Sequence, residues 1–142
     1  MSKYDLVIYG ASGFTGQFVI EYVERASQQH QLTWAVAGRS EGRLRAALAR
    51  AGAVLGTDLS RVPTIVCDSS DTSSLLAMAR QAKLVLNCVG PYRFYGESVV
   101  EACVEAGAHH LDISGEPQYL EKTQLKYHQV GKSLIQIGTL FK

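Results

Sequence analysis

The chain contains 142 residues, of which 46% are hydrophobic and 19% are charged, and its formal net charge is +1. This length allows one domain with a sizeable core, and the balanced composition excludes a disordered chain and a polybasic nucleic-acid surface. No secretory signal pattern precedes the first apolar run and no run is long enough to span a bilayer, so we expect an intracellular, cytoplasmic protein without a transmembrane segment.

Apolar runs alternate with helical patterns along nearly the whole chain. In chain order, strands are expected at residues 6–9, 33–37, 63–67, 84–89, 110–113 and 134–137. Helices are expected between them, at residues 14–26, from residue 40, from residue 71 or 72, at residues 98–106 and at residues 117–129. Regular alternation of this kind predicts a parallel sheet with right-handed crossovers. The predicted fold class is therefore α/β, a doubly wound, mostly parallel sheet of the Rossmann type.

The segment GASGFTG at residues 10–16 joins the first expected strand to the first expected helix. Glycine turns that lead from a strand into a helix present free backbone N–H groups and the positive end of the helix dipole, which together bind phosphate. Gly10 would allow the tight turn, Gly13 would let a pyrophosphate approach the backbone, and Gly16 would let the helix pack closely. Ser12 and Thr15 offer hydroxyl donors. Because the spacing differs from the commoner G-x-G-x-x-G, a structural turn without a ligand is the alternative.

The end of the second expected strand would lie beside the adenosine ribose of a dinucleotide. An acidic residue there selects NAD, whereas this chain has Gly38, Arg39 and Ser40. The Arg39 guanidinium suits a phosphate, and Ser40 offers a hydroxyl and the start of the next helix, which predicts NADP(H) with NAD(H) as the alternative. Asp68, at the end of the third expected strand, would either accept a hydrogen bond from adenine or cap the following turn.

The segment NCVGPY at residues 87–92 ends the fourth expected strand, at the edge of the sheet where open α/β folds bind ligands. Gly90 would allow the backbone to approach a cofactor, and Pro91 would fix the exit of the chain. The candidate cofactor-binding residues of this segment are Asn87, Val89, Gly90 and Pro91.

Three side chains at the same edge could carry proton-transfer chemistry. Tyr92 begins an expected aromatic loop at residues 92–95, which would either dock a partner or cover the sheet. Asp112 and Glu116 follow the fifth expected strand and would bind a substrate amine, act as acid and base, or cap a turn and a helix. These alternatives leave the catalytic residues unassigned.

The sequence predicts no metal site. His109 and His110 are adjacent in an expected strand, so their rings point to opposite faces of the sheet. Cys67, Cys88 and Cys103 are odd in number and form no C-x-x-C pair, which argues against disulfides and zinc.

Four segments together resemble the saccharopine dehydrogenase-like oxidoreductases. They are GASGFTGQFV at residues 10–19, AVAGRS at 35–40, VLNCVGPYRFYGE at 85–97 and DISGEPQ at 112–118, and the resemblance spans residues 4–128. It implies an NAD(P)-dependent oxidoreductase that transfers hydride between NADP(H) and an unidentified small molecule. For some members it also implies a role in lipid metabolism and association with lipid droplets or other membranes. The family's nucleotide-binding positions map onto Gly10, Ser12, Gly13, Phe14, Thr15, Gly16, Arg39 and Ser40.

We expect residues 1–128 to form the dinucleotide-binding domain and residues 129–142 a divergent tail, because the resemblance fades after His128. Longer members of the family continue through a substrate and dimerisation region, which implies homo-oligomers for them and the absence of the substrate domain here. A non-catalytic module that binds a dinucleotide or a partner is the alternative function, since the chain is short and lacks an identifiable acid–base set.

Overall fold

The computed structural model describes residues 2–128, so the sixth strand expected at residues 134–137 lies outside the described part. The strands are β1 (Tyr4–Tyr9), β2 (Trp34–Gly38), β3 (Thr64–Val66), β4 (Ala82–Asn87) and β5 (His109–Asp112). The helices are α1 (Phe14–His30), α2 (Glu41–Leu55), α3 (Thr72–Ala79), α4 (Tyr92–Ala106) and α5 (Pro117–Tyr127). Strand and helix alternate through this part of the chain, as the apolar runs predict.

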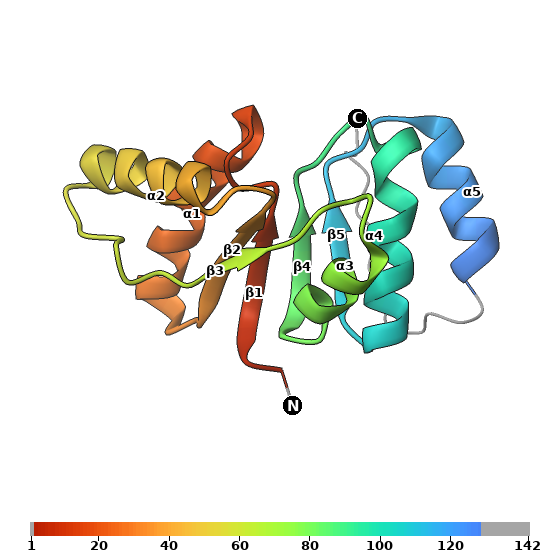
Figure 1. The fold of residues 1–142 in the computed structure, drawn as a ribbon, viewed down its shortest axis with the longest axis horizontal. Coiled ribbons are helices and arrows are strands. Elements are labelled where there is room, and N and C mark those ends of the chain that lie inside the picture. Colours follow the sequence, from red (N-terminus) through yellow and green to blue (C-terminus); the bar gives the residue numbers. More distant parts are fainter. Residues whose placement is uncertain (1, 129–142) are drawn as a thin grey trace.

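These strands form one parallel sheet in the order β3-β2-β1-β4-β5. The chain runs outward from β1 to β3, crosses back to the centre, and then runs outward again from β4 to β5 (Figure 1). This is the strand order of a doubly wound Rossmann sheet, which confirms the predicted fold class. The change of direction between β1 and β4 opens a crevice beyond the carboxyl ends of these two strands, where such folds bind ligands.

Helices cover both faces of the sheet, with α1 and α2 on one face and α3, α4 and α5 on the other (Figure 1). On the first face, the sheet packs against α1 and α2 through a buried cluster that includes Ile8, Ile20, Val36, Leu44 and Leu48. On the second face, the corresponding cluster with α3 and α4 includes Val7, Leu75, Met78, Val85 and Val99. Neighbouring residues of β1 are thus buried on opposite faces, as in a sheet with helices on both sides.

Helix α4 begins at Tyr92 rather than at the expected residue 98, so residues 92–95 form its first turn and not an aromatic loop. The earlier start of α4 is explained by two contacts with residues that are distant in the sequence. The Glu116 carboxylate accepts hydrogen bonds from the first two amides of the helix, those of Tyr92 and Arg93, at 2.8 and 3.0 Å. Gly96 lets α4 approach α5, because a Cβ at this position would lie 2.5 Å from the Tyr119 ring.

Candidate functional site

The glycine loop between β1 and α1 forms a tight turn against two neighbouring strands. Gly10 has a φ of +80°, a conformation that favours glycine, and its amide donates to the Ala37 carbonyl at 2.9 Å. A Cβ on Gly16 would collide with the Gly10 carbonyl oxygen, so Gly16 allows α1 to start close to the turn. Gly13 is the N-cap of α1, where no side chain accepts from the first amides and no acidic residue occupies the first turn. These amides are therefore available to an anion.

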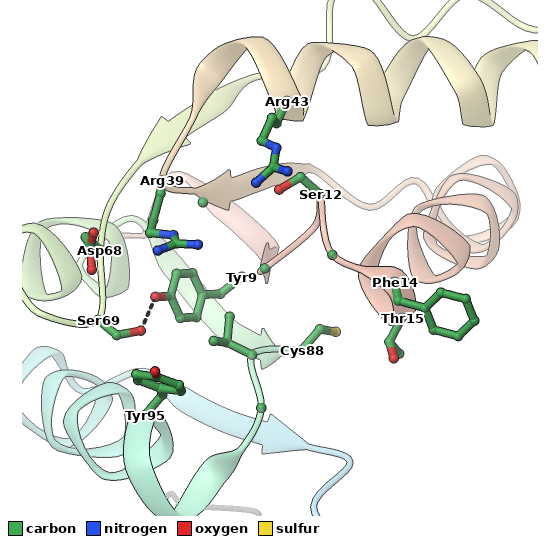
Figure 2. A pocket seen from close by; sticks show the side chains of 15 residues that line it. Tyr9, Ser12, Phe14, Thr15, Arg39, Arg43, Asp68, Ser69, Cys88 and Tyr95 are labelled. Carbon is green, nitrogen blue, oxygen red and sulfur yellow. Dashed lines mark hydrogen bonds between the residues drawn. The ribbon is translucent and has the colours of Figure 1, made fainter.

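A cavity of about 620 Å³ opens beside this loop at the carboxyl edge of the sheet (Figure 2). Nine of the predicted cofactor-binding residues line it, namely Gly10, Ser12, Gly13, Phe14, Thr15, Arg39, Asp68, Val89 and Gly90. Six further residues outside the predicted cofactor-binding set also line it, namely Tyr9, Gly38, Arg43, Ser69, Cys88 and Tyr95. Gly16, Ser40, Asn87 and Pro91, which were also predicted, are not among the lining residues.

Two arginines from neighbouring segments reach this cavity. Arg39 follows the last residue of β2, Arg43 lies in the first turn of α2, and both guanidinium groups point inward (Figure 2). Ser40 is the N-cap of α2, and its hydroxyl accepts from the Arg43 amide at 3.3 Å, so it orients the turn that carries the second arginine. A pair of guanidinium groups beside a glycine loop suits a dianionic phosphate at the ribose end of a dinucleotide. The position of Arg43 one turn beyond the β2 end was the signal that could have identified it.

The part of the cavity wall formed by Tyr9 and the segment after β3 carries hydroxyl and carboxylate groups. The Tyr9 hydroxyl and the Ser69 hydroxyl share a hydrogen bond of 2.6 Å, and burial raises the pKa of Tyr9 (Figure 2). Asp68 accepts from the amide and the hydroxyl of Ser70, both at 2.9 Å, and these bonds lower the pKa of its carboxyl group. Asp68 therefore stabilises the turn after β3, which is the alternative role expected from the sequence. It also lines the cavity and so remains part of the candidate site.

The loop after β4 closes the cavity on the side opposite the arginines. Cys88, Val89 and Gly90 line it, whereas Asn87 is fully buried behind them and Pro91 is the N-cap of α4. The Asn87 side chain accepts from the Val89 amide at 3.0 Å and thereby fixes the course of the loop. Burial raises the pKa of the Cys88 thiol to about 11, so this thiol is protonated near neutral pH and is a poor nucleophile.

The three groups considered for proton transfer are occupied by contacts within the protein. The Tyr92 hydroxyl is buried, donates to the Asn87 carbonyl at 2.8 Å and has a raised pKa because of its burial. Asp112 is buried and accepts from the Tyr119 hydroxyl at 2.7 Å, and Glu116 caps α4. The geometry therefore favours the structural alternatives for all three, and none of them lines the cavity.

Residues 2–128 contain no cluster of three or more His, Cys, Asp or Glu side chains arranged to hold a metal ion. None of the helices described above combines the length and the apolar character needed to cross a membrane.

The sequence of residues 6–133 matches the family described as the saccharopine dehydrogenase NADP-binding domain. A Caenorhabditis elegans protein described as a lipid droplet localized protein is 55% identical over 132 residues, which cover 93% of this chain and 31% of that protein. A Homo sapiens saccharopine dehydrogenase-like oxidoreductase is 55% identical over 132 residues, which cover 89% of this chain and 31% of that protein. The chain thus spans 31% of the length of these curated relatives.

Among solved structures, apo saccharopine dehydrogenase (L-Glu forming) from Saccharomyces cerevisiae superposes with a TM-score of 0.73. The match covers 96% of this chain and 27% of that protein at 17% sequence identity. At this identity the likeness shows the fold alone, which is of the Rossmann type.

Proposed function

This chain belongs to the family of saccharopine dehydrogenase NADP-binding domains, and from that membership we propose that it binds NADP(H) in the cavity at the carboxyl edge of its sheet. The observation that carries the proposal is the convergence of the glycine loop and two arginines on one cavity. The loop supplies backbone amides for the pyrophosphate, and the arginines supply charge for the 2′-phosphate that distinguishes NADP from NAD.

Each part of the cavity has a role in this proposal. The amides of Phe14 and Thr15 hold the pyrophosphate, and Arg39 with Arg43 holds the 2′-phosphate. Asp68, Ser69 and the 88–90 loop line the cavity, and in this proposal the first two would contact the adenine and the loop backbone would contact the nicotinamide. The predicted residues outside the lining, Gly16, Ser40, Asn87 and Pro91, support these groups from behind.

The test is a calorimetric titration of the purified 142-residue chain with NADPH and with NADH. We expect NADPH to bind more tightly, and Arg39→Ala and Arg43→Ala each to weaken NADPH on the order of 10-fold while leaving NADH unchanged. Arg61→Ala removes an equal charge from an exposed arginine that does not line the cavity and serves as the control. A folded chain that binds neither nucleotide, or a double arginine variant with unchanged NADPH affinity, would overturn the proposal.

We further propose that the cofactor serves hydride transfer to or from a small, lipid-related molecule, as part of an oxidoreductase. The nicotinamide supplies or accepts the hydride when it is bound. The chain's own residues bind and orient the cofactor, and the side chains considered as acid or base are engaged in the fold. This last observation favours the alternative, a non-catalytic dinucleotide-binding module. Oxidation of NADPH with a panel of carbonyl and enoyl acceptors would support the enzyme, and binding without turnover would support the module.

An exposed aromatic face of α1 is a candidate surface for association with lipid. Phe14, Phe18 and Tyr22 follow a helical spacing and are 83%, 41% and 69% exposed. Together with the description of the C. elegans relative, this supports the proposal that the chain associates with lipid droplets. In a flotation assay with triacylglycerol emulsions, Phe18→Ser with Tyr22→Ser should reduce co-flotation, and Leu125→Ser, at another exposed apolar residue, should not. Absence of wild-type co-flotation would overturn the proposal.

A further inference from the structure

A buried polar cluster lies behind the candidate cofactor site, on the sheet face covered by α4 and α5. It contains Asn87 at the end of β4 and His110 and Asp112 on β5, which are 0%, 0% and 2% exposed. The Asn87 Nδ2 atom lies 3.3 Å from His110 Nε2, and His110 Nδ1 lies 3.8 Å from the Asp112 carboxylate. Asp112 itself accepts from the Ser114 amide and the Tyr119 hydroxyl. None of these groups lines the cavity.

The orientation of the Asn87 amide follows from its contact with the backbone. The Val89 N–H can only donate, so the Asn87 atom that it meets at 3.0 Å is the oxygen, Oδ1. The amide nitrogen must then face His110 and donate to it. His110 Nε2 is therefore an acceptor without a proton.

The single proton of the neutral imidazole accordingly sits on Nδ1, on the side of the Asp112 carboxylate. Nδ1 is buried and makes no hydrogen bond among the described residues. A proton on Nε2 would place two donors against each other, and rotation of the Asn87 amide would only transfer that conflict to the Val89 N–H. Burial lowers the pKa of His110 below its ordinary value of 6.5, and the Asp112 carboxylate opposes the shift only in part, so the ring is neutral near pH 7.

Val89 connects this arrangement to the glycine loop. A Cβ on Gly10 would lie 2.5 Å from Val89 Cγ2 and 3.3 Å from the Val89 nitrogen, so the two loops are in direct contact. Displacement of Val89 would change both the wall of the cavity and the turn that leads to the free amides of Phe14 and Thr15.

From this geometry we infer that His110 is a positioning residue for the cofactor site. As the neutral Nδ1–H tautomer it accepts from Asn87, and Asn87 in turn anchors Val89 against the glycine loop. The inference rests on the proposed function for its effect on NADP(H), but the tautomer and the anchor are properties of the unliganded chain.

The tautomer is measurable without any ligand. In long-range ¹H–¹⁵N spectra of the 142-residue chain at pH 7, the His110 signals, assigned by their loss in His110→Gln, should show a protonated Nδ1 and an unprotonated Nε2. In Asn87→Asp the second side-chain oxygen would face His110 and accept, so the proton should move to Nε2. A wild-type ring protonated at Nε2, or one charged at pH 7, would overturn the inference.

The binding experiment separates the inference from the proposed function. His110→Leu removes the acceptor and should weaken NADPH on the order of 10-fold, whereas His110→Gln, whose side-chain oxygen can accept from Asn87, should stay close to wild type. His109→Leu, at the exposed neighbour, is the matched control. If the wild type does not bind NADPH, the proposed function fails and the tautomer is still decided by the spectra. If the wild type binds and a folded His110→Leu binds equally well, the positioning role fails.

Discussion

Gly13 and Gly16 are three residues apart at the start of α1, yet their surroundings assign them different tasks. A Cβ on Gly13 would meet only the Gly10 carbonyl, at 3.3 Å, and Gly13 has a φ of −75°, which alanine adopts readily. A Cβ on Gly16 would collide with that carbonyl and lie 2.7 Å from the Ala11 Cα. The first glycine thus leaves room for a ligand, and the second leaves room for the backbone.

We therefore expect Gly13→Ala to weaken NADPH binding at least about 10-fold while lowering the free energy of unfolding by only about 1 kcal/mol, the usual cost of alanine at an N-cap. Gly16→Ala should lower the free energy of unfolding by about 1–3 kcal/mol or more, because overpacking forces the loop apart. Urea unfolding and NADPH titration of both variants check this pair. Unchanged NADPH affinity in Gly13→Ala would contradict the role of the loop as a phosphate site.

Residues that act through the local chain were predictable from the sequence, and residues that act through distant contacts were not. The glycine loop and Arg39 line the cavity, and this location follows directly from their positions after β1 and β2. The role of Glu116 at the start of α4 depends on an approach between segments that are 23 and 24 residues apart. The same holds for the burial of Tyr92, which looks like a proton donor in a loop and instead packs against Tyr119 of α5, with the ring centroids 5.6 Å apart.

At the scale of elements, α4 illustrates how a helix can begin at a place that its own sequence does not mark. Pro91, its N-cap, offers no side-chain acceptor, and the Glu116 carboxylate supplies both acceptors and a negative charge at the positive end of the helix dipole. The local pattern located the later part of the helix and its end at Gly107, where φ is +71°. The first turn was missed because its cap comes from the segment between β5 and α5.

Glu116→Gln tests this cap. The glutamine side chain keeps one acceptor but turns an NH₂ group toward the second amide and removes the charge, so the free energy of unfolding should fall by about 1–2 kcal/mol. Glu101→Gln makes the same change of charge on the exposed face of α4 and should have little effect. Urea unfolding measures both variants. A stability of Glu116→Gln equal to that of Glu101→Gln would show that the carboxylate does not hold the helix start.

At the scale of the whole molecule, buried titratable groups limit the pH range of stability from both sides. Burial raises the pKa of Cys67 and Cys103 from 9.0 to about 12, so the unfolded chain loses these protons first and stability declines as the pH rises above 9.0. Burial lowers the pKa of His110 from 6.5, so the unfolded chain gains this proton first and stability declines as the pH falls below 6.5. The pKa of Glu97 is lowered from 4.5 by its contacts with Lys122 and Lys126, so its contribution is lost only at lower pH.

Between pH 6.5 and 4.5, His110 should therefore dominate the loss of stability, with a slope of at most about 1.4 kcal/mol per pH unit. Urea unfolding at several pH values across this window measures the slope. His110→Gln removes the titrating ring and should flatten it, whereas His109→Gln should preserve it, since His109 is exposed. A slope that persists in His110→Gln would place the proton uptake elsewhere. The same ring contacts Asn87, which accepts from the Val89 amide in the loop of the proposed cofactor site. If that contact positions the loop as inferred, NADPH binding should weaken as the pH falls and the ring gains its second proton.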